Sequence, residues 1–192
     1  QEAGFEAYGA DFASETVERA LKAAPHLKLS LGDVRELPFP DSFFDGHWSI
    51  GVIEHFYDGF EPIASEMRRV LRPGGFLFMT FPAMSPLRRC KARLRAYEMW
   101  DASSRDQTAD FYQFALPANA VLEVMRRHGF ELVEQTAHGG MRGLKAEMPR
   151  LHRILRRSYH GRRRREGLKR ALDSALAPLA GHSVLMVMKR AP

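Results

Sequence analysis

Strand-like and helix-like segments alternate along this chain, and that alternation restricts the fold more than any other feature. Short apolar runs suited to buried strands occupy residues 5–11, 27–31, 46–53, 76–81, 130–136 and 182–189. Helical stripes separate most of them, the clearest at 60–71, with others at 14–24 and 117–129. This order predicts an α/β protein with a doubly wound, mostly parallel sheet and helices on both faces.

Ligands of such sheets bind in the crevice beyond the carboxyl ends of the strands. The segments that reach this edge are 8–11, 31–33 and 50–54, together with the loop after Phe81. The search for a functional site therefore begins with a few residues.

One long stretch, GDVRELPFPDSFFDGHWSIGVIEHF followed by EMRRVLRPGGFLFMTFP, resembles the core of the class I S-adenosylmethionine-dependent methyltransferases. The similar pieces are an acid after a strand, an LPFPD turn, an EH pair and a helix that ends in RPGG. The resemblance is strong over residues 2–81 and looser over 111–136 and the last strand. It implies the Rossmann-like methyltransferase fold with an antiparallel last strand, and S-adenosyl-L-methionine as cofactor.

Elementary chemistry and the resemblance assign the same cofactor contacts. Asp11 ends a strand, where its carboxylate can accept hydrogen bonds from both hydroxyls of a ribose, and Phe12 can lie along an adenine. Asp33 can accept from an exocyclic amine, and the N–H of Val34 can reach a ring nitrogen. Backbone near the reacting methyl group is expected at Ser49, Ile50 and Gly51. Each aspartate has a structural alternative as a helix N-cap, and Phe12 has one as a core residue.

Glu54 and His55 are the candidate catalytic residues. A histidine beside the methyl donor can act as general base toward a substrate hydroxyl or amine. A structural Glu–His pair is the alternative. Relatives of ubiquinone biosynthesis hold a divalent cation with an E-x-x-E-H motif, but Gly51 stands where the first glutamate would be, so no metal site is expected.

The family begins with a strand and a G-x-G-x-G turn, and neither precedes residue 5 here. We therefore expect the printed sequence to be N-terminally truncated, because a sheet without its central strand has two unpaired edges. Neither a signal peptide nor a membrane-spanning run is recognisable, and the single cysteine, Cys90, excludes an internal disulfide, so a cytoplasmic protein is the expectation.

Two insertions stand out from the expected methyltransferase core, which comprises residues 1–141 and 182–192. Residues 82–116 are placed where such enzymes cover their substrate, and Tyr112 and Trp100 are the candidate substrate contacts there. The alternative is that the aromatic residues of this insertion form a small local core. Residues 142–181 form a basic excursion with two expected amphipathic helices around an arginine run. Residues 142–173 contain twelve lysines and arginines but only three acids, so the segment carries a charge of +9 while the whole chain carries +6.

Three interpretations of the excursion remain open: a cap over the site, a surface for an anionic ligand or membrane, and a nucleic-acid site. The last is disfavoured because the run lacks interleaved aromatics. The overall interpretation is methyl transfer from S-adenosylmethionine to a small or lipid-like acceptor. Two alternatives remain. One is a catalytically degenerate binding module that holds an anionic partner. The other is a nicotinamide-dependent oxidoreductase, but this chain lacks the Tyr-x-x-x-Lys pair that such an enzyme usually needs.

Overall fold

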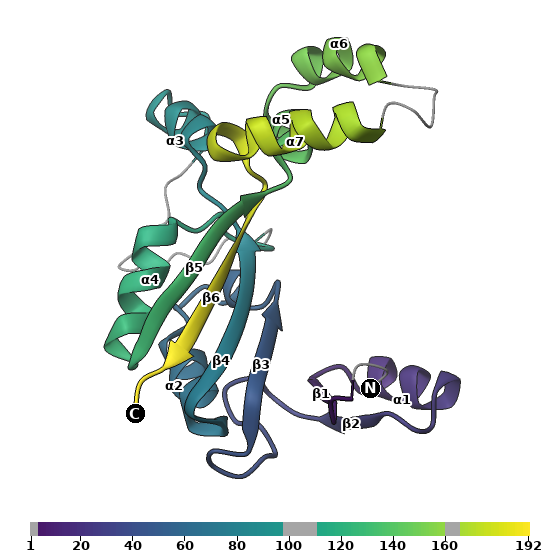
Figure 1. Cartoon of the computed structure of the whole chain (residues 1–192), viewed down its shortest axis with the longest axis vertical. Coiled ribbons are helices and arrows are strands. Elements are labelled where there is room, and N and C mark those ends of the chain that lie inside the picture. Colours follow the sequence, from purple (N-terminus) through teal and green to yellow (C-terminus); the bar gives the residue numbers. More distant parts are fainter. Residues whose placement is uncertain (1–3, 98–110, 160–165) are drawn as a thin grey trace.

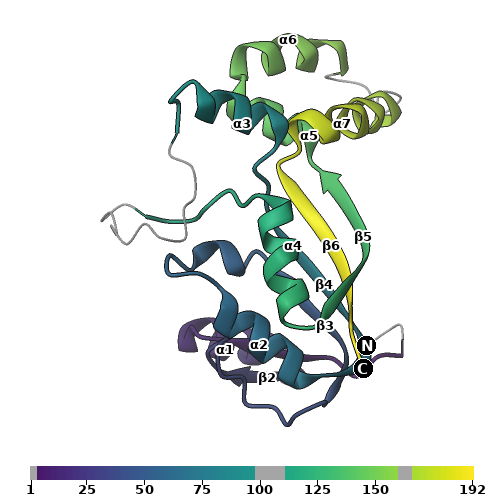
Figure 2. The same ribbon diagram turned by 90° about the vertical axis from the view of Figure 1, so that its left-hand side faces the viewer.

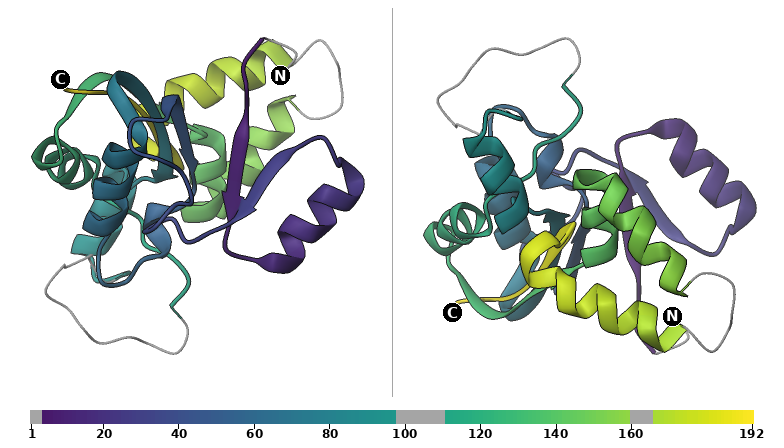
Figure 3. Two further views of the ribbon diagram at one scale, coloured as in Figure 1. Left: turned by 90° about the horizontal axis from the view of Figure 1, so that it is seen from below. Right: turned by 90° about the horizontal axis from the view of Figure 1, so that it is seen from above.

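The computed structural model describes residues 4–97, 111–159 and 166–192 (Figure 1). It contains a two-stranded parallel sheet and a four-stranded mixed sheet. The small sheet pairs β1 (Tyr8–Asp11) with β2 (Lys28–Leu31), and α1 (Ser14–Ala23) connects them. Viewed along the long axis, this unit stands to one side of the larger sheet (Figure 3).

The four-stranded sheet has the order β3-β4-β6-β5. Its strands are β3 (Phe44–Ile50), β4 (Leu71–Pro82), β5 (Phe130–His138) and β6 (Ser183–Arg190). β3 and β4 are parallel, whereas β6 runs antiparallel to both of its neighbours. The predicted α/β class and the antiparallel last strand are confirmed.

The main core lies between this sheet and two helices, α2 (Glu61–Val70) and α4 (Ala118–Arg127), which cover one face (Figure 2). Leu77, Met79 and Phe81 point into it from alternate positions of β4, as the period of a strand requires. On the opposite face Trp48 and Ile50 are 66% and 65% exposed. Helices were expected on both faces of the sheet, but in the described ranges this face has no helical layer.

The i, i+3 spacing of Glu66 and Arg69 on α2 has a clear structural role. Glu66 is buried, and its Oε1 accepts the N–H of Leu37 at 2.6 Å, while Arg69 donates to both of its carboxylate oxygens. Arg69 also donates to the Phe39 carbonyl at 2.8 Å and to Asp41 at 2.7 Å. The pair therefore clamps the turn between β2 and β3 onto α2.

Four helices form a cap beyond the carboxyl end of β4 (Figures 1 and 2). They are α3 (Pro86–Arg93), α5 (Gly140–Glu147), α6 (Pro149–Tyr159) and α7 (Glu166–Ala180). The two amphipathic helices predicted for the basic excursion correspond to α6 and α7, whereas α5 was not predicted. Met141, Leu144 and Ala180 are the buried centre of a small cap core.

Glu147 joins the two insertions. Its buried carboxylate accepts hydrogen bonds from Arg88 at 2.9 Å, from Lys91 at 2.8 Å and from the Tyr97 hydroxyl. Burial raises the pKa of Glu147, but these donors outweigh it and lower the pKa to about 2. Because α3 precedes the segment 98–110 and α5 follows β5, this cluster makes one cap from two distant parts of the chain.

Candidate functional site

Contacts link the loops that follow β1, β2 and β3, although the single sheet expected from the sequence was wrong: β1 and β2 form a two-stranded sheet of their own. The N–H of Gly32, after β2, donates to the carbonyl of Asp11 at 3.0 Å. The guanidinium of Arg35 lies over the ring of Phe56, 5.6 Å from its centroid, and so joins the loop after β2 to the loop after β3. The N–H of Gly51 donates to a carbonyl oxygen of β4 at 3.0 Å. These contacts connect neighbouring loops of the two sheets, and the candidate residues lie in or next to these loops.

Asp11 is the last residue of β1, and its side chain is half-buried. Its Oδ1 accepts the N–H of Ala13 at 2.8 Å, which stabilises the turn into α1. Within the described residues its Oδ2 has no hydrogen-bond donor, so one carboxylate oxygen is available for a ligand hydroxyl. The neighbouring Phe12 is 83% exposed and is therefore not part of the core.

Asp33 is already paired in this structure. Its carboxylate accepts two-pronged hydrogen bonds from Arg35, including one of 2.6 Å, and also the backbone N–H of Arg35 at 2.8 Å. The side-chain hydrogen bonds from Arg35 lower the pKa of Asp33 to about 2. A contact from Asp33 to an exocyclic amine therefore requires this pair to open. The following residue, Val34, packs its side chain against the main core.

Two buried side-chain oxygen atoms at or just after the end of β3 lack hydrogen-bond partners among the described residues. These atoms are Ser49 Oγ and Glu54 Oε2. Glu54 lies on η1 (Ile53–His55), and burial raises its pKa above the ordinary value. Gly51 between them has φ +67°, a conformation that favours glycine, while Ile50 is exposed on the uncovered sheet face. Unpaired polar groups of this kind favour a ligand site.

His55 and Tyr112, predicted separately, lie in contact. The imidazole Nδ1 is 2.8 Å from the Tyr112 carbonyl oxygen, and the two rings meet edge to face at 5.0 Å. A carbonyl oxygen only accepts, so Nδ1 carries a proton, and in the neutral imidazole Nε2 then has the lone pair. Trp100, the other predicted substrate contact, lies outside the described residues.

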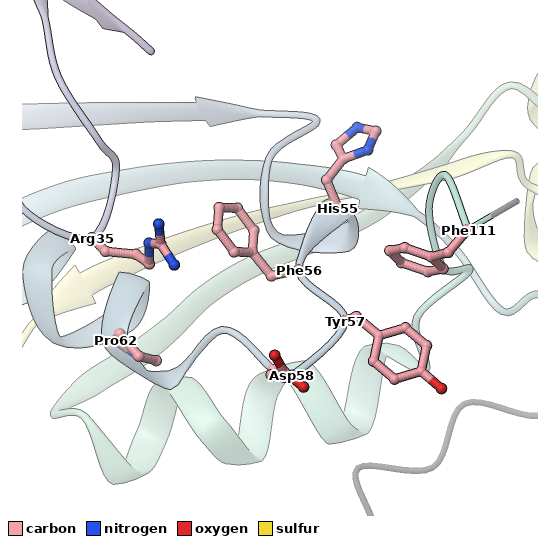
Figure 4. A pocket seen from close by; sticks show the side chains of 8 residues that line it. Arg35, His55, Phe56, Tyr57, Asp58, Pro62 and Phe111 are labelled. Atoms are coloured by element: carbon pink, nitrogen blue, oxygen red, sulfur yellow. The ribbon is translucent and has the colours of Figure 1, made fainter. Parts of the chain in front are cut away.

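A pocket of about 390 Å³ adjoins His55 (Figure 4). It is lined by Arg35, His55, Phe56, Tyr57, Asp58, Gly59, Pro62 and Phe111. Of these, only His55 was predicted as a site residue, although Phe111 was expected in the substrate-covering insertion. The rings of Tyr57 and Phe111 meet at 5.1 Å, which brings the loop after β3 against that insertion. The described residues contain no cluster of three or more metal-ligating side chains.

A family model described as a methyltransferase domain matches residues 1–79. This segment is similar to that family and makes up less than half of the chain. It contains the strand ends at Asp11, Asp33 and Ser49, so the family match covers the predicted cofactor contacts.

Curated relatives are similar to part of the chain. A probable S-adenosylmethionine-dependent methyltransferase of Mycolicibacterium smegmatis is 36% identical over 74 residues, which is 38% of this chain and 28% of the relative. A fatty-acid O-methyltransferase of the same species is 41% identical over 54 residues, 28% of this chain and 19% of the relative. The matched segments thus span less than a third of either relative's length.

Solved structures extend the similarity to the fold of the whole chain. An S-adenosylmethionine-dependent methyltransferase from Archaeoglobus fulgidus has a TM-score of 0.61 at 12% identity, covering 98% of this chain and 78% of the other. The cyclase SpnF has a TM-score of 0.56 at 20% identity, covering 96% and 66%. A cyclase among the neighbours illustrates that the fold alone does not define the reaction.

Proposed function

We propose that this chain binds S-adenosylmethionine and transfers its methyl group to a small or lipid-like acceptor. The proposal rests on the contacts that link the loops after β1, β2 and β3, on the pocket beside His55, and on the family match over residues 1–79. The acceptor atom stays open, because this scaffold supports several kinds of methylation.

The side chains of these loops suit most parts of S-adenosylmethionine. Asp11 offers a carboxylate oxygen to a ribose hydroxyl, and the exposed ring of Phe12 offers a flat apolar face to an adenine. The unpaired Ser49 Oγ and Glu54 Oε2 suit a polar amino-acid end. Gly51 has no side chain to obstruct close approach to the backbone. Asp33 contributes only after Arg35 moves.

The sulfonium of the bound cofactor supplies an electrophilic methyl group, so the protein has mainly to align an acceptor with it. In this proposal neutral His55 takes the acceptor's proton on Nε2, and the hydrogen bond from its Nδ1–H to the Tyr112 carbonyl supports this role. Phe56, Tyr57 and Phe111 give the adjoining pocket an aromatic wall that can contact an apolar acceptor.

An apolar, lipid-like acceptor fits this wall best. Two of the matched relatives have names that specify lipid substrates, a fatty-acid O-methyltransferase and a sterol 24-C-methyltransferase of Gibberella zeae. The pocket also contains Arg35 and Asp58, which can bind a polar end of the acceptor.

Cofactor binding is tested with Asp11→Ala and Asp11→Asn. We expect S-adenosylmethionine to bind the unaltered chain and to raise its melting temperature, while a nicotinamide dinucleotide does neither. Both variants should lose roughly 30- to 100-fold in affinity by titration calorimetry, since a charged hydrogen-bond acceptor for the ribose is removed. Asp11→Asn keeps an acceptor for the Ala13 N–H, so it separates ligand binding from the stability of the turn.

The matched control is Asp45→Ala, because Asp45 lies near the start of β3, away from the carboxyl edge. It should bind the cofactor as the unaltered chain does. Unchanged affinity for S-adenosylmethionine in both Asp11 variants would contradict the proposed contact between Asp11 and the ribose. No binding of S-adenosylmethionine to the unaltered chain would contradict the proposed function and favour the binding-module alternative.

His55→Gln tests the proton acceptor once an acceptor substrate is found. We expect kcat to fall at least about 100-fold with little change in KM, because the lost group acts in the transition state. Tyr112→Phe is the control, since it retains the backbone carbonyl and the ring that contact His55. Equal turnover in His55→Gln and Tyr112→Phe would leave His55 with a structural role.

A further inference from the structure

The helix α6 combines exposed apolar side chains with a high positive charge. Its sequence, PRLHRILRRSY, contains four arginines and no acid. The apolar residues Leu151, Ile154 and Leu155 follow a helical i, i+3, i+4 spacing and so share one face. Only Leu155 packs against the cap core, whereas Leu151 is 40% and Ile154 61% exposed. An exposed apolar stripe on a helix this polar needs a partner.

Charged side chains border the stripe. A helix turns about 100° per residue, so Arg150 lies next to Ile154 around the helix. Arg150 and Arg153 are both exposed. At the beginning of α7, Leu168 is 46% exposed and the next residue is the exposed Lys169, which repeats the combination. The acid nearest in sequence before α6, Glu147, is turned inward onto Arg88 and Lys91. The outer surface of the cap is therefore basic and apolar together.

α6 also has a position that leaves its outer face accessible. It is the part of the cap farthest from the four-stranded sheet in both side views (Figures 1 and 2). It rests on α5 and α7 through Leu155, so its exposed residues do not contribute to the core. Among the described helices none is long and apolar enough to cross a bilayer.

We propose that α6 docks in the plane of an anionic lipid bilayer. Leu151 and Ile154 enter the boundary between headgroups and acyl chains, and the arginines bind lipid phosphates, as basic amphipathic helices do. An acidic protein or phosphopeptide would use the charge but would leave the two aliphatic side chains unpaired. A nucleic acid would require flat aromatic platforms, and the exposed apolar residues here are aliphatic. This inference does not depend on methyl transfer.

Vesicle flotation of the chain, without cofactor, tests the proposal. We expect binding to vesicles of phosphatidylcholine mixed with phosphatidylglycerol, none to phosphatidylcholine alone, and release at high salt because screening weakens surface charges. The double variant Arg150→Gln/Arg153→Gln should lose roughly 10- to 30-fold in partitioning, at about fivefold per arginine. Leu151→Gln/Ile154→Gln should lose at least about tenfold, because buried methylene groups contribute to interfacial binding.

The control is Arg126→Gln/Arg127→Gln, which removes an exposed basic pair from α4. It should float with the vesicles as the unaltered chain does, and all variants should melt at the same temperature. Four results would overturn the proposal: no binding to the anionic vesicles, equal binding of the Leu151/Ile154 variant, displacement by soluble glycerophosphoglycerol, or preference for single-stranded RNA. The third would indicate a phosphate site and the fourth a nucleic-acid site.

Discussion

Gly143→Ala is expected to dismantle the cap and lower the free energy of unfolding by about 3 kcal/mol, as overpacking against rigid backbone does. A Cβ atom at this position would lie 1.7 Å from the carbonyl oxygen of Ala180 and 3.2 Å from the backbone nitrogen of His182. Both obstacles are main chain, so no rotamer change relieves the overlap. α5 and α7 would have to separate, and the buried contacts of Met141 and Leu144 would be lost with them.

Chemical denaturation and hydrogen exchange measure this effect. Exchange should accelerate in α5 and α7 while the amides of β3 and β4 stay protected, because the cap core is separate from the main core. Gly167→Ala is the matched control, since an added Cβ there has no heavy atom within 4 Å. It should be neutral or stabilising by up to about 1 kcal/mol through helix propensity. Equal stability of the two variants would refute the close packing of α5 on α7.

The helix α5 shows where prediction from the sequence failed. Residues 140–147 read GMRGLKAE, and two glycines make a poor isolated helix, so none was predicted. The glycines are instead required by contact: a Cβ at Gly140 would lie 2.4 Å from the backbone of Asp173, and Gly143 is closer still to Ala180. Residues 140–147 form a helix because of their tertiary contacts with α7, which hydrophobic periodicity along the sequence does not reveal.

The strands and the principal helices were predictable because their apolar periodicity is local. Asp11, Ser49 and Glu54 could be named as candidates for the same reason, since each lies at or just after the end of a strand. Arg35 and Phe56 were missed, because the pocket they line exists only after two loops meet. The Asp33–Arg35 pair had a signal that went unused: opposite charges two residues apart in a turn can pair locally.

Glu66→Ala is expected to lower the free energy of unfolding by about 2 to 3 kcal/mol, the low end for a broken buried pair because Arg69 is a third exposed. The substitution removes the acceptor of the Leu37 N–H and leaves Arg69 holding only the carbonyls of Leu37 and Phe39 and the exposed Asp41. Hydrogen bonds from Arg69 lower the pKa of Glu66, while burial opposes them. The stabilisation is therefore present above the ordinary pKa of 4.5 and is lost as the pH falls through the lower folded-state value.

The control is Asp45→Ala, which breaks the ion pair with Arg72 on the surface, where both side chains are more than half exposed. Exposed pairs contribute under about 1 kcal/mol, so this variant should unfold almost as the unaltered chain does. Hydrogen exchange in Glu66→Ala should increase at residues 37–41 before the sheet opens. The clamped turn follows Arg35 directly in sequence, so its release should also weaken cofactor affinity, although Glu66 does not line the pocket.

Equal denaturation midpoints for Glu66→Ala and Asp45→Ala would contradict this role of the buried carboxylate. They would show that aromatic contacts hold the turn instead, such as the one between the rings of Tyr8 and Phe39, whose centroids are 6.0 Å apart.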